Sequence, residues 1–439
     1  MKNTPIDAQI VSKILQELNL KGELDKASIR EIVRLVDEIE NESGQKFIRM
    51  EMGVPGLKPP KRLINAEIEA IENDVISKYP MIEGVRELKE EASLFAKLFM
   101  NIDTLPEHIV PTVGSMQASF AIFLTSQRID EKKNKVLFID PGFPVQKQQC
   151  DVIGIKYDSF DVYEYRGKAL KKKLEEYLST GEYSTLIYST PNNPTWIIFT
   201  EEELKIIGEV CNKYDVIAIE DLAYFAMDFR YDYSKPGKPP YQPTVANFTD
   251  NYILIFSSSK LFSFAGERIG IIFLSSKIFN RNYEPLKKNY KTAKFGYSII
   301  YGALYALSAG VNHSAQVAFA RMLKSINDGE ENLTAHVKEY AYRAKVLKKI
   351  FTENGFYIVY DKDIDKPIAD GFYFTLHYPG MTTNELMEKL LYYGISAIAL
   401  KTTGSKKEGI RACVSMVLPE YFPVLEQRLK KFHSDHPIQ

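Results

Sequence analysis

A lysine that follows an apolar run is the residue of this sequence best suited to covalent chemistry. Lys260 comes after the apolar residues 253–256 and three serines, the first of which is Ser257, and Arg268 follows shortly afterwards. A lysine amine attacks an aldehyde only when it is neutral, and burial or neighbouring cations lower its pKa enough to supply that form. The hydroxyls and the guanidinium group are donors suited to a phosphate. Taken alone, the segment fits a solvated surface lysine as well as a cofactor lysine.

An acid follows a second apolar run. Residues 217–219 are apolar, and Asp221 and Tyr224 come soon after them. Such an acid can simply cap a turn. A carboxylate beside a pyridine nitrogen, however, keeps that nitrogen protonated and makes the ring an electron sink. Tyr224 would then lie within reach of the ring hydroxyl.

Three further segments follow apolar runs or precede helical ones. Prolines and asparagines in residues 191–195 predict a rigid turn, which is a plain loop by default but could hold Asn193 against a phenolate oxygen. Phe143 is either a core aromatic or a side chain that stacks on a flat ring. Gly114, just before the apolar stretch 118–124, predicts a helix whose first amide groups suit a phosphate.

The elements that must position these residues alternate between short apolar runs and helical patterns from about residue 67 to residue 320. This alternation predicts a parallel sheet covered by helices, with ligands at the carboxyl ends of its strands. We expect a second unit from the N-terminal helices and the C-terminal part. The expected strands are residues 136–139, 185–188, 216–219, 253–256 and 270–274 in the first unit, and 371–377, 395–400 and 410–416 in the second.

Composition limits the classes of partner. The formal net charge is -1 over 439 residues, so we expect neither nucleic acid nor a membrane surface as a partner. No apolar run is long enough to span a membrane. Cys150, Cys211 and Cys413 match no disulfide or zinc pattern, so no metal is expected and a cytoplasmic location is favoured.

Together these segments resemble the class I/II aminotransferases of fold type I, in order, from about Glu51 to Met416. The resemblance implies an α/β fold with a large domain, built on a mostly parallel sheet covered by helices, and a smaller α/β domain. We expect residues 63–322 to form the large domain, and residues 1–62 and 323–439 the small one. The matching segments are 52–55, Tyr79 with Gly84, 114–117, 140–143, 191–195, 221–224, 257–270 and Arg411.

The resemblance also implies pyridoxal 5'-phosphate (PLP) as cofactor. Lys260 would form the Schiff base to PLP and move the proton of the substrate alpha carbon, while Asp221 pairs with the ring nitrogen. Tyr79 would reach the phosphate of a partner subunit, which implies a homodimer with shared active sites. The other implied contacts are Tyr224 and Asn193 for the ring hydroxyl, Phe143 for stacking, and Ser257, Arg268, Ser115, Met116 and Gln117 for the phosphate. Arg411 would clamp the substrate carboxylate, with Gly53 and Asn193 bordering it.

The implied reaction is amino transfer from an L-amino acid to a 2-oxo acid by a ping-pong mechanism. A lyase or decarboxylase of the same fold, a PLP-binding regulator and a Rossmann-like enzyme without PLP are the alternatives. Lys401 and Lys406 could reach a distal carboxylate but also fit a solvated loop, so dicarboxylic and aromatic substrates both stay open. Trp196 stands where the family usually has glycine, either at the mouth of the pocket or packed at the domain interface.

Overall fold

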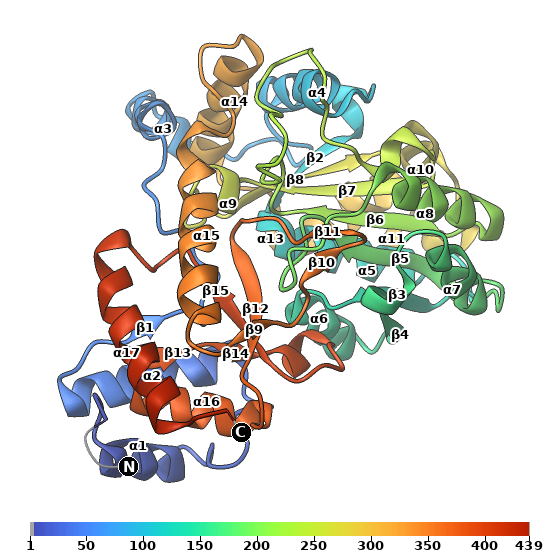
Figure 1. Cartoon of the computed structure of the whole chain (residues 1–439). Coiled ribbons are helices and arrows are strands. Elements are labelled where there is room, and N and C mark those ends of the chain that lie inside the picture. Colours follow the sequence, from blue (N-terminus) through green and yellow to red (C-terminus); the bar gives the residue numbers. More distant parts are fainter. Residues whose placement is uncertain (1–3, 439) are drawn as a thin grey trace.

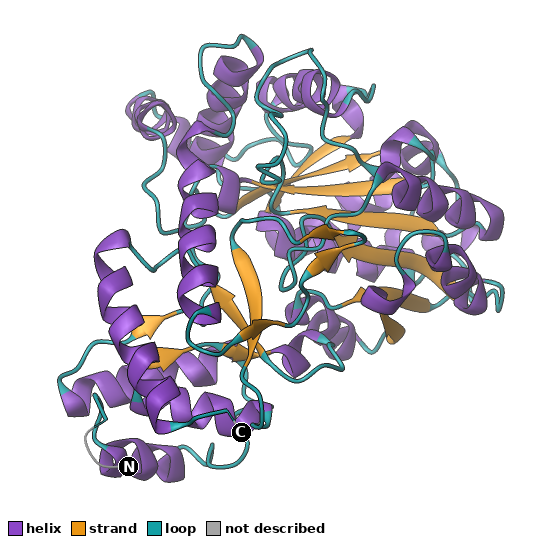
Figure 2. Ribbon diagram, in the orientation of Figure 1, coloured by secondary structure: helices purple, strands orange, loops and turns teal. Residues whose placement is uncertain are grey.

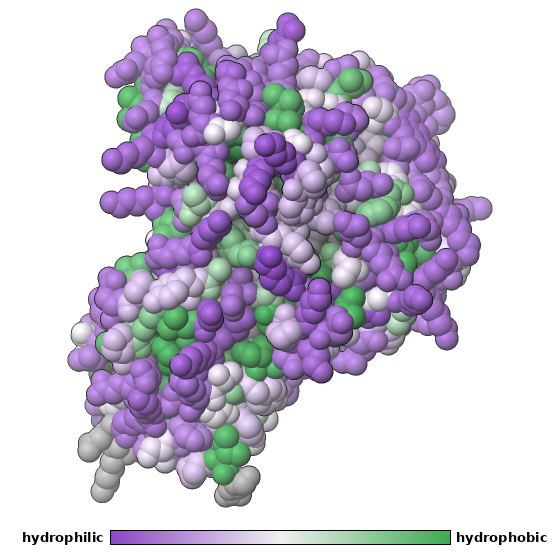
Figure 3. Space-filling model, turned by 45° about the horizontal axis from the view of Figure 1, so that its top comes forward, coloured by the Kyte–Doolittle hydropathy of each residue, from purple (hydrophilic) through white to green (hydrophobic). Residues whose placement is uncertain are grey.

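The computed structural model describes residues 4–438 and has two parts, a large one built on a seven-stranded sheet and a smaller one that holds both described ends of the chain (Figure 1). Polar groups cover most of the face drawn in Figure 3, and hydrophobic groups gather at its lower left, over the smaller part. No helix in the described part of the chain is long and apolar enough to cross a membrane.

The large sheet has the strand order β2-β8-β7-β6-β5-β3-β4. Neighbouring strands from β7 to β4 are parallel, and β8 runs antiparallel to both β7 and β2. The mostly parallel sheet and the five strands expected in it are thereby confirmed. The strands are β2 (Ile109–Val113), β3 (Lys135–Asp140), β4 (Lys156–Asp161), β5 (Tyr183–Ser189), β6 (Ile217–Leu222), β7 (Tyr252–Ser257) and β8 (Ile269–Leu274).

Both faces of this sheet are buried under helices, as Figure 2 shows. In β7, Ile253 and Ile255 enter one hydrophobic cluster, whereas Leu254 and Phe256 enter the other. A strand buried on two sides needs a continuous apolar run, which is why these runs were recognisable in the sequence. The helices of this part are α3 (Lys61–Glu72), α4 (Arg86–Met100), α5 (Gly114–Ser126), α6 (Pro144–Ile153), α7 (Ala169–Leu178), α8 (Glu201–Tyr214), α9 (Ser258–Leu261), α10 (Ser276–Asn280), α11 (Lys287–Tyr290), α12 (Phe295–Tyr297), the π-helix η6 (Ser298–Leu304), α13 (Tyr305–Ser308) and α14 (His313–Asn327).

The smaller part combines the chain ends. Its four-stranded sheet has the order β14-β15-β12-β9, and β1 (Ile48–Arg49) pairs with β13 (Ile395–Ser396) beside it. A capping box is present at the start of α2, where the side chains of Ser28 and Glu31 each accept from the other's backbone N–H group. The remaining elements are α1 (Ala8–Glu17), α2 (Ile29–Ser43), α15 (Lys338–Thr352), α16 (Thr383–Tyr392), α17 (Phe422–Asp435), β9 (Tyr357–Ile358), β12 (Tyr373–His377), β14 (Ile398–Ala399) and β15 (Ile410–Cys413). A short hairpin pairs β10 (Lys362–Asp363) with β11 (Lys366–Pro367).

The predicted domain limits fall inside two helices. Residue 63 lies in α3 and residue 322 in α14, and these two helices pack against each other beside the large sheet. The division into residues 63–322 and the two flanking segments stays a prediction.

Candidate functional site

A cavity of about 220 Å³ lies at the carboxyl ends of the large sheet's parallel strands, where the smaller part meets it. That volume is roughly what seven molecules of liquid water occupy, enough for a small organic group. Eleven predicted residues line it: Gly53, Ser115, Met116, Phe143, Asn193, Asp221, Tyr224, Ser257, Lys260, Arg268 and Arg411. They come from segments spread over most of the chain, and the fold brings them together.

Lys260 lies in the short helix α9, directly after β7, and its side chain is partly buried and lines the cavity. Its Nζ atom donates a hydrogen bond to the carbonyl oxygen of Gly53. Burial, aided by the charges of Arg411 and Arg268, lowers the pKa of Lys260 to about 8. A useful fraction of the amine is therefore neutral near physiological pH, as a nucleophile toward an aldehyde requires.

Asp221 lies at the end of β6 and is buried. Its carboxylate accepts two hydrogen bonds, from Gln146 Nε2 at 2.9 Å and from the backbone N–H of Ala223 at 3.1 Å. Burial nevertheless raises the pKa of Asp221 to about 6, because the charged form loses the solvation that water gives it. A protonated pyridine nitrogen beside the carboxylate would stabilise that charged form. The sequence reasoning missed Gln146, and only its place in the first turn of α6 after Pro144 hints at it.

Tyr224 meets a second phenol that the sequence reasoning also missed. Its hydroxyl is 2.7 Å from that of Tyr373, which lies on β12 and lines the cavity. Burial raises the pKa of both phenols, so both keep their protons. A Cβ atom on Gly53 would lie 1.9 Å from the Tyr373 hydroxyl oxygen, so position 53 requires glycine. The Tyr224 hydroxyl donates to that of Tyr373, and this contact fixes the Tyr224 ring at the cavity wall.

Trp196 packs behind this pair of phenols and does not line the cavity. It is fully buried, with its ring edge-on to Tyr224 at 5.3 Å and to Tyr373 at 6.3 Å between centroids. Its φ is +63°, the left-handed conformation that a glycine adopts more readily. A Cβ atom on Gly371 would lie 2.0 Å from the indole. Of the two places expected for Trp196, these contacts favour packing between the two parts of the molecule over the mouth of the pocket.

One end of the cavity concentrates hydrogen-bond donors. Helix α5 begins here at Gly114, and Ser115 and Met116 form its first turn. A Cβ atom on Gly114 would lie 2.3 Å from Arg268 Nη2, so glycine lets this guanidinium lie against the helix start. Helix amides, the Ser257 hydroxyl and a guanidinium are the donors that phosphates prefer. These donors, with Lys260 and Asp221 at the places described, fit PLP.

Arg411 lies on β15 and is buried. Its guanidinium donates to the carbonyl oxygen of Glu51 and, over 3.2 Å, to Asn193 Oδ1, and it lies 4.6 Å from the centre of the Tyr373 ring. Its Nε atom is buried without a partner among the described residues. The cavity thus holds three cationic side chains against one acid, which suits a ligand with two anionic groups.

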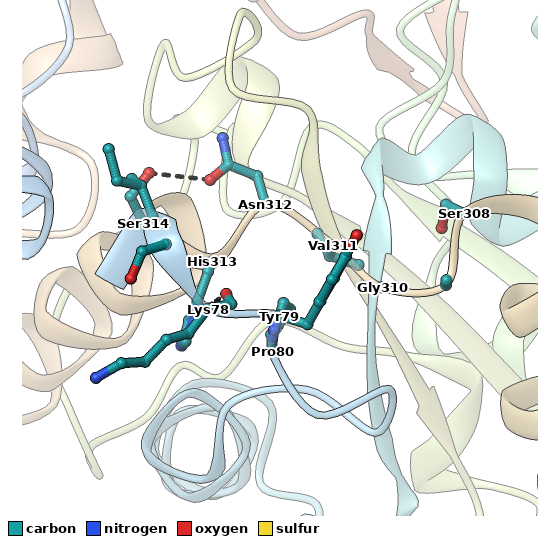
Figure 4. A pocket seen from close by; sticks show the side chains of 12 residues that line it. Lys78, Tyr79, Pro80, Ser308, Gly310, Val311, Asn312, His313 and Ser314 are labelled. Carbon is teal, nitrogen blue, oxygen red and sulfur yellow. Dashed lines mark hydrogen bonds between the residues drawn. The ribbon is translucent and has the colours of Figure 1, made fainter. Parts of the chain in front are cut away.

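Two predicted residues do not line this cavity. Gln117 instead accepts from the backbone N–H of Val113 at 2.7 Å and donates to Ser308 at 2.8 Å. Tyr79 is 96% exposed and lines a separate pocket with the segment from Ser308 to Ser314 (Figure 4). Its predicted role involves a second subunit and stays a prediction.

Comparison with known proteins gives a consistent result. The family described as "Aminotransferase class I and II" matches residues 45–427. The probable aspartate aminotransferase of Methanocaldococcus jannaschii is 27% identical over 277 residues, which are 62% of this chain and 70% of that protein. The aspartate aminotransferase of Bacillus subtilis is 25% identical over 232 residues, 52% of this chain and 56% of that protein. The solved Thermotoga maritima aspartate aminotransferase shares the fold, with a TM-score of 0.74 and 18% identity over 93% of this chain and 97% of that chain.

Proposed function

Because this chain belongs to the class I and II aminotransferase family, whose members use PLP, we propose that its cavity moves an amino group from an L-amino acid to a 2-oxo acid. The chain is a PLP-dependent aminotransferase of fold type I, and the expected fold and cofactor are confirmed. A lyase, a decarboxylase and a non-catalytic regulator are not favoured. The proposal concerns the residues that perform each step.

When bound, PLP supplies an aldehyde that holds the substrate nitrogen and a ring that withdraws electrons from the alpha carbon. Lys260 would hold the aldehyde, and its neutral amine would take the proton from the substrate alpha carbon. Asp221 keeps the ring nitrogen protonated. Asn193 would donate to the ring oxygen through its amide NH₂ group, and so would Tyr224 once its proton turns away from Tyr373, while Phe143 would stack on the ring.

Two anion sites would orient the cofactor and the substrate. The α5 amide groups, Ser257 and Arg268 would bind the cofactor phosphate, and Arg411 would bind the substrate alpha-carboxylate through its planar fork. Lys260 lines the same cavity, so its amine would be available to the alpha-carbon proton. The observation that carries this proposal is the convergence of a neutral-capable lysine, a buried acid and a buried guanidinium on one cavity.

The half-reaction tests the proposal. The PLP-loaded protein is mixed with one L-amino acid at a time, without an acceptor, and the cofactor absorbance and the released 2-oxo acid are measured. We expect the absorbance of the aldehyde form to convert to that of the amine form, with one 2-oxo acid per site. Release of ammonia, carbon dioxide or an olefin without that conversion would instead indicate a lyase or decarboxylase.

We further propose a homodimer. Exposed apolar side chains lie on α3, on the segment that follows it and on α12, η6 and α13: Ile64, Ile68, Ile71, Ile76, Tyr79, Met81, Tyr297, Tyr301, Tyr305 and Leu307. Such a patch is costly to leave in water. The Gln117–Ser308 hydrogen bond ties the edge of this patch to α5, so a partner's Tyr79 could approach the phosphate donors. Sedimentation of the wild type as a monomer at micromolar concentration would contradict this.

A cytoplasmic location is also our proposal. All three cysteines, Cys150, Cys211 and Cys413, are buried and unpaired by disulfides, which suits a reducing compartment. Fractionation of the cells that make the protein tests it.

A further inference from the structure

A second, larger cavity opens beside the catalytic one. Its volume is about 630 Å³, and it lies between the start of α2, the start of α6 and Lys401 of the smaller part. Ile29 and Phe143 line both cavities, so the two adjoin at these side chains. Because Lys260 and Arg411 would fix the alpha carbon and its carboxylate inside, a substrate side chain that passes between Ile29 and Phe143 enters this outer cavity.

The outer cavity is apolar over part of its lining. Ile29 and Phe143 stand at the opening, and Pro144 and Val145 follow Phe143 directly in the chain and line the same cavity. Burial of a methylene chain against such walls is favourable because it removes apolar surface from water. The stem of the side chain that fits this passage is therefore aliphatic.

Three cationic side chains surround the outer part of the cavity, and two of them are already neutralised. Lys26 pairs with Glu23 at 2.5 Å, and Lys401 pairs with Asp25 at 2.9 Å. Arg30 forms no salt bridge with any residue that the structure describes. Of these three charges, that of Arg30 is available to bind an anionic ligand.

Arg30 also occupies a position that disfavours a cation. Ser28 is the N-cap of α2, so Arg30 lies in the first turn, where the free N–H groups already give the helix a positive end. A basic residue there costs a few tenths of a kcal/mol in the absence of an anion. When an anion occupies the outer cavity, the Arg30 guanidinium and the positive end of α2 both attract it.

We propose that Arg30 is a specificity-determining residue that binds a carboxylate at the far end of the substrate side chain. The preferred donors are then amino acids with an aliphatic stem and an anionic end, and the corresponding oxo acids. This inference rests on the proposed aminotransferase function and adds the substrate class to it.

The test compares donors of matched length in wild type, Arg30→Gln and Arg34→Gln. Arg34 lies one turn further along α2, is exposed, pairs with Glu38 at 2.8 Å and does not line the cavity. Arg34→Gln therefore removes the same charge from the same helix without altering the cavity wall. The donors are L-glutamate and L-2-aminoadipate, with L-glutamine and L-norleucine as their uncharged counterparts. The readout is kcat/KM, divided into kcat and KM, for each donor.

We expect Arg30→Gln to lower kcat/KM for the two acidic donors by about tenfold through KM, as the loss of one charge-assisted hydrogen bond predicts, and the uncharged donors to change less than twofold. Calorimetry on the PLP-free protein should show the same loss for glutarate and none for butyrate. An unchanged ratio of acidic to uncharged donors, or an equal effect of Arg34→Gln, would overturn the inference. Absence of amino transfer from every donor in the wild type would instead refute the proposed function.

Discussion

Replacing Asp221 by asparagine should stabilise the PLP-free protein while it destroys activity. Burial raises the pKa of Asp221 from 3.8 to about 6. The folded state therefore binds more protons than the unfolded state between these pH values, and its stability falls as the pH rises through that window. This difference in pKa between the unfolded and folded states corresponds to about 3 kcal/mol, by which the ionised carboxylate lowers the free energy of unfolding at pH 8.

Asparagine removes this cost but also one acceptor. Only one of the two donors, Gln146 or the Ala223 N–H group, can keep its bond to the new amide oxygen, although the Gln146 amide can turn and offer its own oxygen. Allowing about 1 kcal/mol for that loss, we expect a net gain of about 2 kcal/mol in the free energy of unfolding at pH 8 and none at pH 4. Activity with PLP should fall by about 10²–10³, because the ring nitrogen loses its counter-charge.

Urea denaturation of the PLP-free proteins at pH 4 and pH 8, followed by circular dichroism, measures the predicted gain. Glu220→Gln is the matched control. Glu220 is the neighbouring buried acid, its pKa is raised to about 8 by burial, and it lies outside the cavity. That variant should gain stability and keep its activity. If Asp221→Asn is less stable than wild type at pH 8, the buried-charge reasoning is wrong.

Three further predictions concern the same cavity. Gly53→Ala should reduce kcat/KM by about tenfold or more, since the added Cβ would lie 1.9 Å from the Tyr373 hydroxyl oxygen. Adding Tyr373→Phe to this variant should restore part of the lost kcat/KM. If the double variant is no more active, the clash with Tyr373 is not the cause of the defect. The rate at which PLP attaches to the PLP-free protein should rise with pH around a midpoint near 8, where Lys260 loses its proton, and a midpoint above 10 in stopped-flow absorbance would contradict the lowered pKa. Arg411→Lys keeps the charge but loses the planar fork, so KM for every amino donor should rise by roughly tenfold with the cofactor spectrum unchanged; an unaltered KM would remove Arg411 from carboxylate binding.

The strands that carry the site could be predicted because they are buried on both faces and read as unbroken apolar runs. Two other strands of the large sheet could not be predicted. Strand β2 contains Pro111, which weakens a strand pattern, and β4 at the sheet edge mixes lysine, aspartate and serine with its aromatic residues. The run at residues 395–400 was expected as one strand, but the structure divides it between β13 and β14 in two different sheets.

The cofactor residues were predictable for a related reason, since Asp221 lies in the last residues of such a strand and Lys260 and Asn193 follow the carboxyl ends of two others. Gln146 and Tyr373 were not, because nothing in the local pattern links them to their partners. Tyr373 meets Tyr224 across 149 positions of sequence, and only the packing of the smaller sheet on the large one creates that contact. Trp196 was ambiguous for the same reason, as its neighbours Tyr373 and Gly371 belong to the other part.

The most direct test of the central claim is borohydride reduction of the PLP-loaded protein, followed by proteolysis and peptide mass spectrometry. We expect a phosphopyridoxyl group on Lys260 alone, close to one per chain, and none in Lys260→Ala. A group attached to any other lysine, or no attachment at all in the wild type, would contradict the assignment of this cavity as the PLP site.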